Sequence, residues 1–370
     1  MRSILFVGVV LGACSFRPPT GAGPDGGGDD TIDAEFPIDA PDAAPGAARK
    51  RRITIDPAQV TGNHTQFPVW VVIDGAIGDR ALPDGRDIFF TRPDGSPIPY
   101  ERQRWDQDSD HLEAWVRIDL SDTAPTELDL RYGDAGLAHP QAPPEVFANG
   151  YAAVWHLEST TTIPDATGAV NGTPSELAPS HGVTGSLGRG IQFDGGTGTI
   201  AFANPLAGNA PHTISLWVRQ TGTTDNDALI VLGTPSCGRS RWLHSRYNAA
   251  TVAMGFYCND WPNPGQNIID AGPTLLHWVY DGTFSRLYRN GALVAGPQPH
   301  NTATQVDTQG PTGHLGWAPG AWGPSMGAHA MMDEVRIARV VRTADYIATE
   351  HRSQQAPSTF YSVGAEQAAP

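Results

Sequence analysis

Apolar and polar side chains alternate along several short segments of this chain. Every second residue from Leu112 to Leu120 is apolar, and residues 127–132 repeat the pattern. A period of two indicates half-buried β-strands, whereas the unbroken apolar run of residues 67–73 is typical of a more fully buried strand. Turn dipeptides of the Asp-Gly and Asn-Gly type, at residues 281–282 and 290–291, separate later strand segments. We therefore predict an all-β protein.

The predicted strands fall into two groups. Residues 49–134 predict a small β-sandwich-type domain, and residues 151–366 contain many short strands with the spacing of a jelly-roll sandwich. The Pro-rich segment 135–150 between them predicts a short stiff linker. One short helix is expected from Ala344 to about Ser353, with Thr343 as its N-cap.

The first 14 residues have the features of an export signal. Arg2 precedes an apolar run that ends at Leu11 and is too short to span about 30 Å of hydrocarbon. Residues 11–14, Leu-Gly-Ala-Cys, resemble a bacterial lipobox, which implies that Cys14 carries a lipid anchor in the membrane. The alternative is ordinary signal cleavage after Ala13, for which Leu11 is too large. An Asp directly after the lipobox cysteine would resemble an inner-membrane retention signal of Gram-negative lipoproteins, but this chain has Ser15 there. The resemblance therefore implies that the protein is anchored in the outer membrane, on its periplasmic or cell-surface side.

Residues 15–48 are rich in Pro, Gly, Ala and Asp. A segment of this composition cannot bury enough apolar surface to offset its ordering entropy, so we predict a disordered acidic tether. The formal net charge of the whole chain is −15, which excludes nucleic acid as a partner because nothing would neutralise its phosphates. The one basic run, residues 49–52, is interpreted as a solvated strand start.

The chain has three cysteines. With Cys14 assigned to the anchor, Cys237 and Cys258 form an even pair in an oxidising compartment, and we predict that they form a disulfide. Zinc binding is disfavoured because the sequence contains no C-x-x-C motif.

Two family resemblances extend this picture. The first covers nearly all of residues 49–134, which are similar to a bacterial domain of unknown function, the DUF2341 family. It implies the fold of this region but no enzymatic or binding activity. It is carried, in order, by the segments at residues 52–55 (RITI), 67–69 (FPV), 85–90 (GRDIFF), 98–101 (IPYE), 114–116 (AWV) and 130–133 (LRYG).

The second resemblance covers residues 151–366, which look like the laminin-G-like branch of the concanavalin A-like lectin/glucanase superfamily. It implies a binding module for glycans or proteins, frequently with a structural Ca²⁺. The segments that carry it include residues 155–157 (WHL), 165–168 (DATG), 193–195 (FDG), 214–218 (ISLWV), 277–282 (HWVYDG), 287–291 (LYRNG) and 332–337 (MDEVRI).

Two acidic residues match positions that often supply calcium oxygens in that family, Asp165 and Asp333. Calcium takes six to eight oxygens, so two carboxylates underdetermine a site. The alternatives are an Asx-turn at Asp165 and a surface ion pair at Asp333 or Glu334.

Five loop or strand-end aromatics are candidate ligand contacts, because rings beside polar groups can stack on the apolar faces of sugars. Burial in the sandwich ends is the equally weighted alternative. They are Trp242, Tyr247, Trp261, Trp317 and Trp322. Trp155, Trp217 and Trp278 lie in regular strand patterns and are interpreted as structural.

Catalytic patterns are weak. Glycoside hydrolysis needs two carboxyls across a cleft, but the Glu-x-Asp-x-Glu runs of related glucanases are absent from the sequence. Asp333 and Glu334 are adjacent, so on a regular strand they would point to opposite faces. Residues 323–327 match G-x-S-x-G, followed by Asp345 and His351, but a Gly/Pro loop precedes the serine instead of a strand.

We therefore predict a non-enzymatic, monomeric surface lipoprotein that binds a glycan or an extracellular protein through loops of its laminin-G-like domain. The alternatives are an envelope scaffold without a ligand and, less favoured, a divergent glycoside hydrolase.

Overall fold

The computed structural model describes residues 48–369 apart from residues 76, 137–138, 159–161, 176–179, 223–226, 248–250, 263, 269–271, 301–305 and 318–325. Cys14 and the predicted tether, up to residue 47, lie outside this range. The described chain forms four antiparallel sheets and three α-helices, which confirms the all-β prediction. None of the helices in the described part has the length and apolar character needed to cross a membrane.

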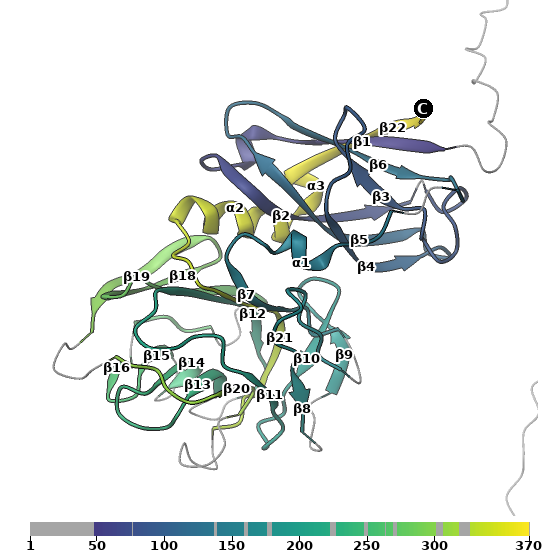
Figure 1. Ribbon diagram of the computed structural model, residues 1–370. Coiled ribbons are helices and arrows are strands. Elements are labelled where there is room, and N and C mark those ends of the chain that lie inside the picture. The colour runs from purple at the N-terminus through teal and green to yellow at the C-terminus, as the bar shows by residue number, and fades with distance from the viewer. Residues whose placement is uncertain are drawn as a thin grey trace, which may run out of the picture. The chain divides into compact units, whose positions relative to one another are not determined.

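The first region is a sandwich of two sheets (Figure 1). Apolar residues of both sheets, including Ile53, Phe67, Val116 and Leu130, share one core, which explains the strand alternation. One sheet has the order β22-β1-β6-β3 and the other β2-β5-β4. Their bounds are β1 (Arg49–Ile55), β2 (His64–Asp74), β3 (Phe89–Thr91), β4 (Tyr100–Asp106), β5 (His111–Leu120), β6 (Thr126–Tyr132) and β22 (Tyr361–Ala368), with a 3-10 turn at Pro57–Gln59.

The last strand of the chain belongs to this first sandwich. Strand β22 pairs with β1, Tyr361 opposite Ile55, and the short helix α3 (Pro357–Phe360) leads into it. Phe360 and Tyr361 are buried in the first core. The sequence predicts that residues 151–366 belong to the second domain. Strand β22, however, forms its backbone hydrogen bonds with β1 of the first region.

The second region is a two-sheet sandwich. One sheet runs β19-β18-β17-β12-β21-β10-β9, with β7 also paired to β21, and the other runs β16-β15-β14-β13-β20-β11-β8. Trp155 and Trp278 lie fully buried in the core between the sheets, as predicted. The strands are β7 (Tyr151–Trp155), β8 (Thr173–Pro174), β9 (Ser180–Thr184), β10 (Arg189–Gln192), β11 (Ile200–Ala203), β12 (His212–Gln220), β13 (Ala228–Gly233), β14 (Ser240–Tyr247), β15 (Thr251–Phe256), β16 (Asn259–Trp261), β17 (Thr274–Tyr280), β18 (Phe284–Arg289), β19 (Ala292–Pro299), β20 (Thr312–Leu315) and β21 (Ala330–Ala338).

The predicted helix is present as α2 (Ala344–Gln355). The side chain of Thr343 accepts a hydrogen bond from the backbone N–H of Tyr346, so it is the N-cap that we expected. The helix contacts β2 of the first region and β19 of the second (Figure 1). Helix α2 therefore lies where the two regions meet.

The segment predicted as a stiff linker is packed rather than extended. It contains the helical turn α1 (Pro143–Val146), and Val146 and Phe147 are buried. They pack in a small apolar cluster with Trp115 of β5 and Trp217 of β12. The alternation of residues 112–120 predicts that Trp115 lies on the polar face of its strand, but the second region covers that face. Residues 44–370 accordingly form one compact unit.

The disulfide prediction is confirmed. Cys237 and Cys258 are bonded, with their Cα atoms 4.9 Å apart. The bond joins the loop before β14 to the turn between β15 and β16, at one edge of the second sandwich.

Candidate functional site: a pocket at the junction of the two regions

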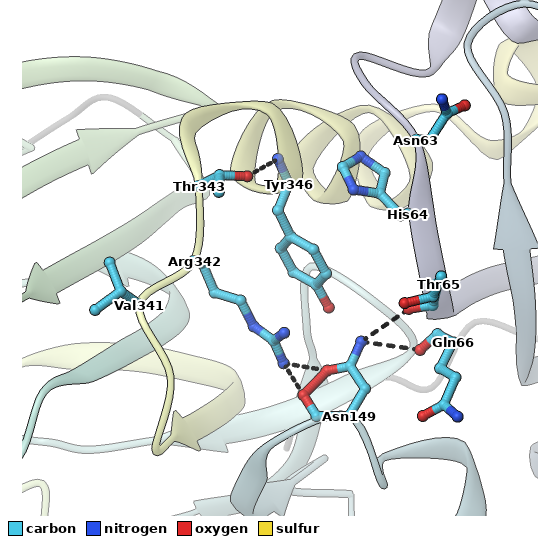
Figure 2. Close-up of a pocket in the computed structure, with 9 residues that line it drawn as sticks. All are labelled: Asn63, His64, Thr65, Gln66, Asn149, Val341, Arg342, Thr343 and Tyr346. Atoms are coloured by element: carbon cyan, nitrogen blue, oxygen red, sulfur yellow. Dashed lines mark hydrogen bonds between the residues drawn. The ribbon is translucent and has the colours of Figure 1, made fainter.

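A pocket opens where the start of β2, the residue before Gly150 and β7, and the start of α2 meet (Figure 2). Its volume is about 460 Å³, within the range of about 300–1,000 Å³ that is usual for small-ligand sites. Both regions contribute to it. The lining residues are Asn63, His64, Thr65, Gln66, Asn149, Val341, Arg342, Thr343 and Tyr346.

The guanidinium of Arg342 is held in place by Asn149 and by two tyrosines. Its Nη2 donates to the backbone oxygen of Asn149 at 2.7 Å and also to the side-chain oxygen of that residue. Its Cζ lies 4.2 Å from the ring centroid of Tyr346 and 4.5 Å from that of Tyr151. Cation–π contacts of this kind fix a guanidinium without neutralising it.

Asn149 also ties the pocket to the first region. Its Nδ2 donates to the backbone oxygen of Gln66 at 2.9 Å (Figure 2). Gln66 has a φ of 53°, at a bulge between His64 and Phe67 of β2. A non-glycine residue in this left-handed conformation costs free energy, and such strain is found most often at functional sites.

His64 contributes no positive charge to the pocket at neutral pH. Burial lowers the pKa of its imidazole, and its Nε2 shares a hydrogen bond of 3.2 Å with the hydroxyl of Thr349. Arg342 is therefore the one charged side chain among the residues that line the pocket.

Beneath the pocket, a buried polar network joins the two regions. His156 lies between Glu334, at 2.6 Å, and Glu101 of β4, at 3.1 Å. Arg336 bonds Glu334 at 2.7 Å and Glu350 of α2 at 2.9 Å. Burial opposes the charge on His156, but the two carboxylates outweigh it and raise the pKa of its imidazole to about 10. Each charge of this network thus has an oppositely charged partner.

Two carboxylates from the two regions also meet at Gly188. A Cβ at this glycine would lie 2.6 Å from Oε1 of Glu158 and 3.0 Å from Oε2 of Glu113. Burial, reinforced by the charges of Glu334 and Glu113, raises the pKa of Glu158 to about 7. Glu158 is therefore partly protonated at neutral pH.

The raised pKa of Glu158 predicts a pH dependence of stability. Since the folded state binds this proton more tightly than the unfolded chain, stability should fall as the pH rises from 4.5 to about 7. In Glu158→Gln, the free energy of unfolding should decrease by roughly 1–2 kcal/mol less over this pH range than in the wild-type protein, after allowance for partial exposure of the carboxyl. Urea unfolding of both proteins at pH 5 and pH 8 measures the difference. Parallel pH profiles for the two proteins would contradict the assignment.

The two predicted calcium ligands have other partners. The carboxylate of Asp165 accepts five hydrogen bonds, one of them from the N–H of Thr167, as in the Asx-turn alternative. Asp333 is fully buried and accepts from the N–H groups of Ser186 and Leu187, so neither it nor the buried Glu334 forms a surface ion pair. The described residues contain no group of three or more His, Cys, Asp or Glu that could hold a metal ion. Calcium stays a prediction.

Strand β21 is irregular at these acids. Glu334 has a φ of 51°, and the pairing with β12 shifts by a bulge at this point. The strict alternation that we assumed for Asp333 and Glu334 is therefore interrupted. One oxygen of Asp333, Oδ1, is buried without a partner, and burial together with the charge of Glu334 raises the pKa of its carboxyl well above the usual range.

Of the predicted aromatic contacts, the three that the structure describes, Trp242, Trp261 and Trp317, do not line the pocket. Trp242 is 4 % exposed and donates from Nε1 to Asp260 across the face of the second sheet, so it offers no open ring face. Trp261 packs against the core, and Trp317 is half-buried. Trp322 and the side chain of Tyr247 lie outside the described residues, as do residues 323–325 of the G-x-S-x-G match.

Sequence reasoning missed the pocket because no motif marks it. Its lining residues come from three separate segments, and only Thr343 was singled out, as a helix cap. The one available signal was an arginine immediately before the predicted helix.

Comparisons with known proteins bear on the second region. Residues 194–348 match the Laminin_G_3 family model, described as the concanavalin A-like lectin/glucanases superfamily. The second region therefore has a concanavalin A-like fold, as its resemblance implied. No curated protein matches the chain. The DUF2341 resemblance of the first region stays a prediction.

Solved structures with similar folds are distant. Domain 4 of AbnA, an extracellular arabinanase from Geobacillus stearothermophilus solved with arabinotriose, is 18 % identical, with a TM-score of 0.44, over 55 % of this chain and 98 % of that chain. Trypanosoma rangeli sialidase in complex with 2,3-difluorosialic acid is 12 % identical, with a TM-score of 0.42, over 67 % of this chain and 42 % of that chain. The receptor binding domain of botulinum neurotoxin D is 10 % identical, with a TM-score of 0.38, over 55 % and 53 %.

Proposed function

We propose that this protein is a non-catalytic binding protein that recognises a glycan in the pocket between its two regions. One observation carries the proposal: side-chain amides, hydroxyls and a guanidinium from both regions surround a cavity of about 460 Å³. Sugar hydroxyls donate and accept hydrogen bonds, and amide side chains offer both functions. The match of residues 194–348 to a lectin and glucanase superfamily supports the same class of ligand.

The proposed address is the outer membrane, through a lipid on Cys14. A tether of residues 15–48 would have an r.m.s. span of roughly 30 Å, which suits display of the folded part away from the membrane. Incorporation of labelled palmitate by the wild-type chain, and its loss in Cys14→Ser, tests the anchor. Equal labelling of both chains would refute it.

The experiment for glycan binding is an array screen of soluble residues 49–370, with and without calcium. Thr65 and Gln66 are exposed lining residues, so Thr65→Ala combined with Gln66→Ala should weaken a hit about tenfold through lost hydrogen bonds. Ser362→Ala with Gln367→Ala is the matched control, because both residues are exposed on β22. Hits that survive the pocket variant would move the site to other loops of the second region. A blank array would favour the scaffold alternative.

A further inference from the structure

We infer that the junction pocket selects glycans that carry a carboxylate, and that Arg342 binds this group. The inference rests on the proposed function of the pocket and adds the class of ligand: a hexuronate or another sugar acid. Arg342 is the only charged residue of the lining, so the pocket presents a single positive charge to its ligand.

Arg342 differs from Arg336, the fully buried arginine of the junction, in forming no ion pair with a described acidic residue, although, against the opposing effect of burial, the charge of Glu350 helps to raise the pKa of its guanidinium. Arg336 meets two carboxylates, those of Glu334 and Glu350. Within the described part of the chain, Arg342 forms no ion pair: both of its hydrogen bonds to Asn149 come from Nη2, and Nε is buried without a partner. A half-buried guanidinium without a directly bonded carboxylate is costly, and its planar donor fork matches a carboxylate.

The surroundings of Arg342 keep this donor set in one orientation. Tyr346 and Tyr151 lie against the guanidinium, and Asn149 holds one of its nitrogens. A site whose donors are already fixed spends little entropy on ordering them when a ligand binds. The start of α2, directly after Thr343, adds the positive end of a helix dipole to the same wall of the pocket, which the acidic Asp345 of the first helical turn partly offsets.

The pocket also suits a sugar acid rather than a small inorganic anion. Around the single charge it offers the exposed side chains of Asn63, Thr65 and Gln66, which can bond hydroxyl groups. Its volume of about 460 Å³ exceeds the need of a bare carboxylate or phosphate. One carboxylate and several hydroxyls on one ring is the ligand pattern that this lining complements.

The experiment compares matched sugar pairs on soluble residues 49–370. The probes are the methyl glycosides of glucose and glucuronate, and of galactose and galacturonate, titrated by calorimetry at pH 7. We expect at least one acid to bind about tenfold more tightly than its neutral partner, and this preference to shrink in high salt. Neither measurement needs a variant, so both stand even if a substitution unfolds the protein.

Variants then assign the preference to one residue. Arg342→Gln should abolish the preference for the acid, and Arg342→Lys should retain part of it because a lysine keeps the charge but not the fork. Arg104→Gln is the control for net charge, since Arg104 is exposed on β4 and lines no part of the pocket. Unchanged melting temperatures show that each variant is folded.

The outcomes separate the two proposals. Equal binding of acid and neutral sugars, with loss of both in the Thr65→Ala/Gln66→Ala protein, would overturn the inference and leave glycan binding in the pocket intact. A preference for the acid that survives in Arg342→Gln would also overturn it. No binding of any glycan, on the array or by calorimetry, would overturn both proposals.

Discussion

Replacement of Phe360 by Ala is expected to lower the free energy of unfolding by about 3–5 kcal/mol, the usual cost of deleting a fully buried phenyl ring. Phe360 is 0 % exposed and packs in the core of the first sandwich, although it lies near the C-terminus. Its backbone oxygen also accepts from the N–H of Asp56, at the end of β1, at 3.1 Å. The cavity would therefore open in a region that begins about three hundred residues earlier in the sequence.

Urea unfolding of residues 49–370 measures this effect. Val363→Ala is the matched control, because Val363 lies on the same β22 but is 37 % exposed. We expect the control to cost less than about 1 kcal/mol. Equal destabilisation by the two substitutions would contradict the placement of α3 and β22 in the first core.

Removal of the Arg336 guanidinium, as Arg336→Met, is the second large effect, with an expected loss of about 3–5 kcal/mol. Arg336 is 1 % exposed, bonds Glu334 and Glu350, and lies 4.3 Å from the ring centroid of Trp115. Methionine keeps the apolar stem but leaves two buried carboxylates short of a counter-charge. Glu334 keeps its bond to His156 and Glu350 its bond to His277, so the cost comes from an excess of buried negative charge rather than from lost contact area.

The control is Arg286→Met, which breaks a 2.7 Å pair with Asp281 whose side chains are 28 % and 26 % exposed. A pair of this exposure contributes at most about 1 kcal/mol. Adding Glu350→Gln to Arg336→Met should recover part of the loss, since one stranded charge is then removed. Strictly additive losses in the double variant would contradict the charge argument.

These contacts pack the two regions against each other as one compact unit. The network of His156, Glu334 and Arg336 and the apolar cluster around Trp115 and Trp217 lie on the surface that the regions share. The junction pocket opens at the margin of the same contact, with Asn149 bonded to both sides. A ligand in this pocket would contact both regions, so the proposed binding function would involve the first region as well as the second.

The chain ends of the folded part also meet. The N–H of Ala369 donates to the backbone oxygen of Ala48 at 2.9 Å, so the end of β22 lies beside the start of β1. The first sandwich therefore includes a strand that follows the whole second region in the sequence.

Local patterns in the sequence determined the elements of this protein. The alternation of Leu112 to Leu120 predicted β5, Thr343 marked the start of α2, and the even pair Cys237 and Cys258 predicted the disulfide. The first two signals act within a few residues, through side-chain period and cap chemistry, whereas the disulfide prediction came from the even number of cysteines left after Cys14, which lie 21 residues apart. The order of weak motifs was also enough to indicate the concanavalin A-like domain.

Only the tertiary structure decided what covers each face. A period of two says that Trp115 and Glu113 lie opposite the core of their own sandwich, but it cannot say that a second sandwich buries them. The return of β22 to β1 and the meeting of Asn149 with Arg342 likewise join residues far apart in sequence. Such contacts follow from the packing of whole sheets, because a side chain's own neighbours in sequence carry no information about them.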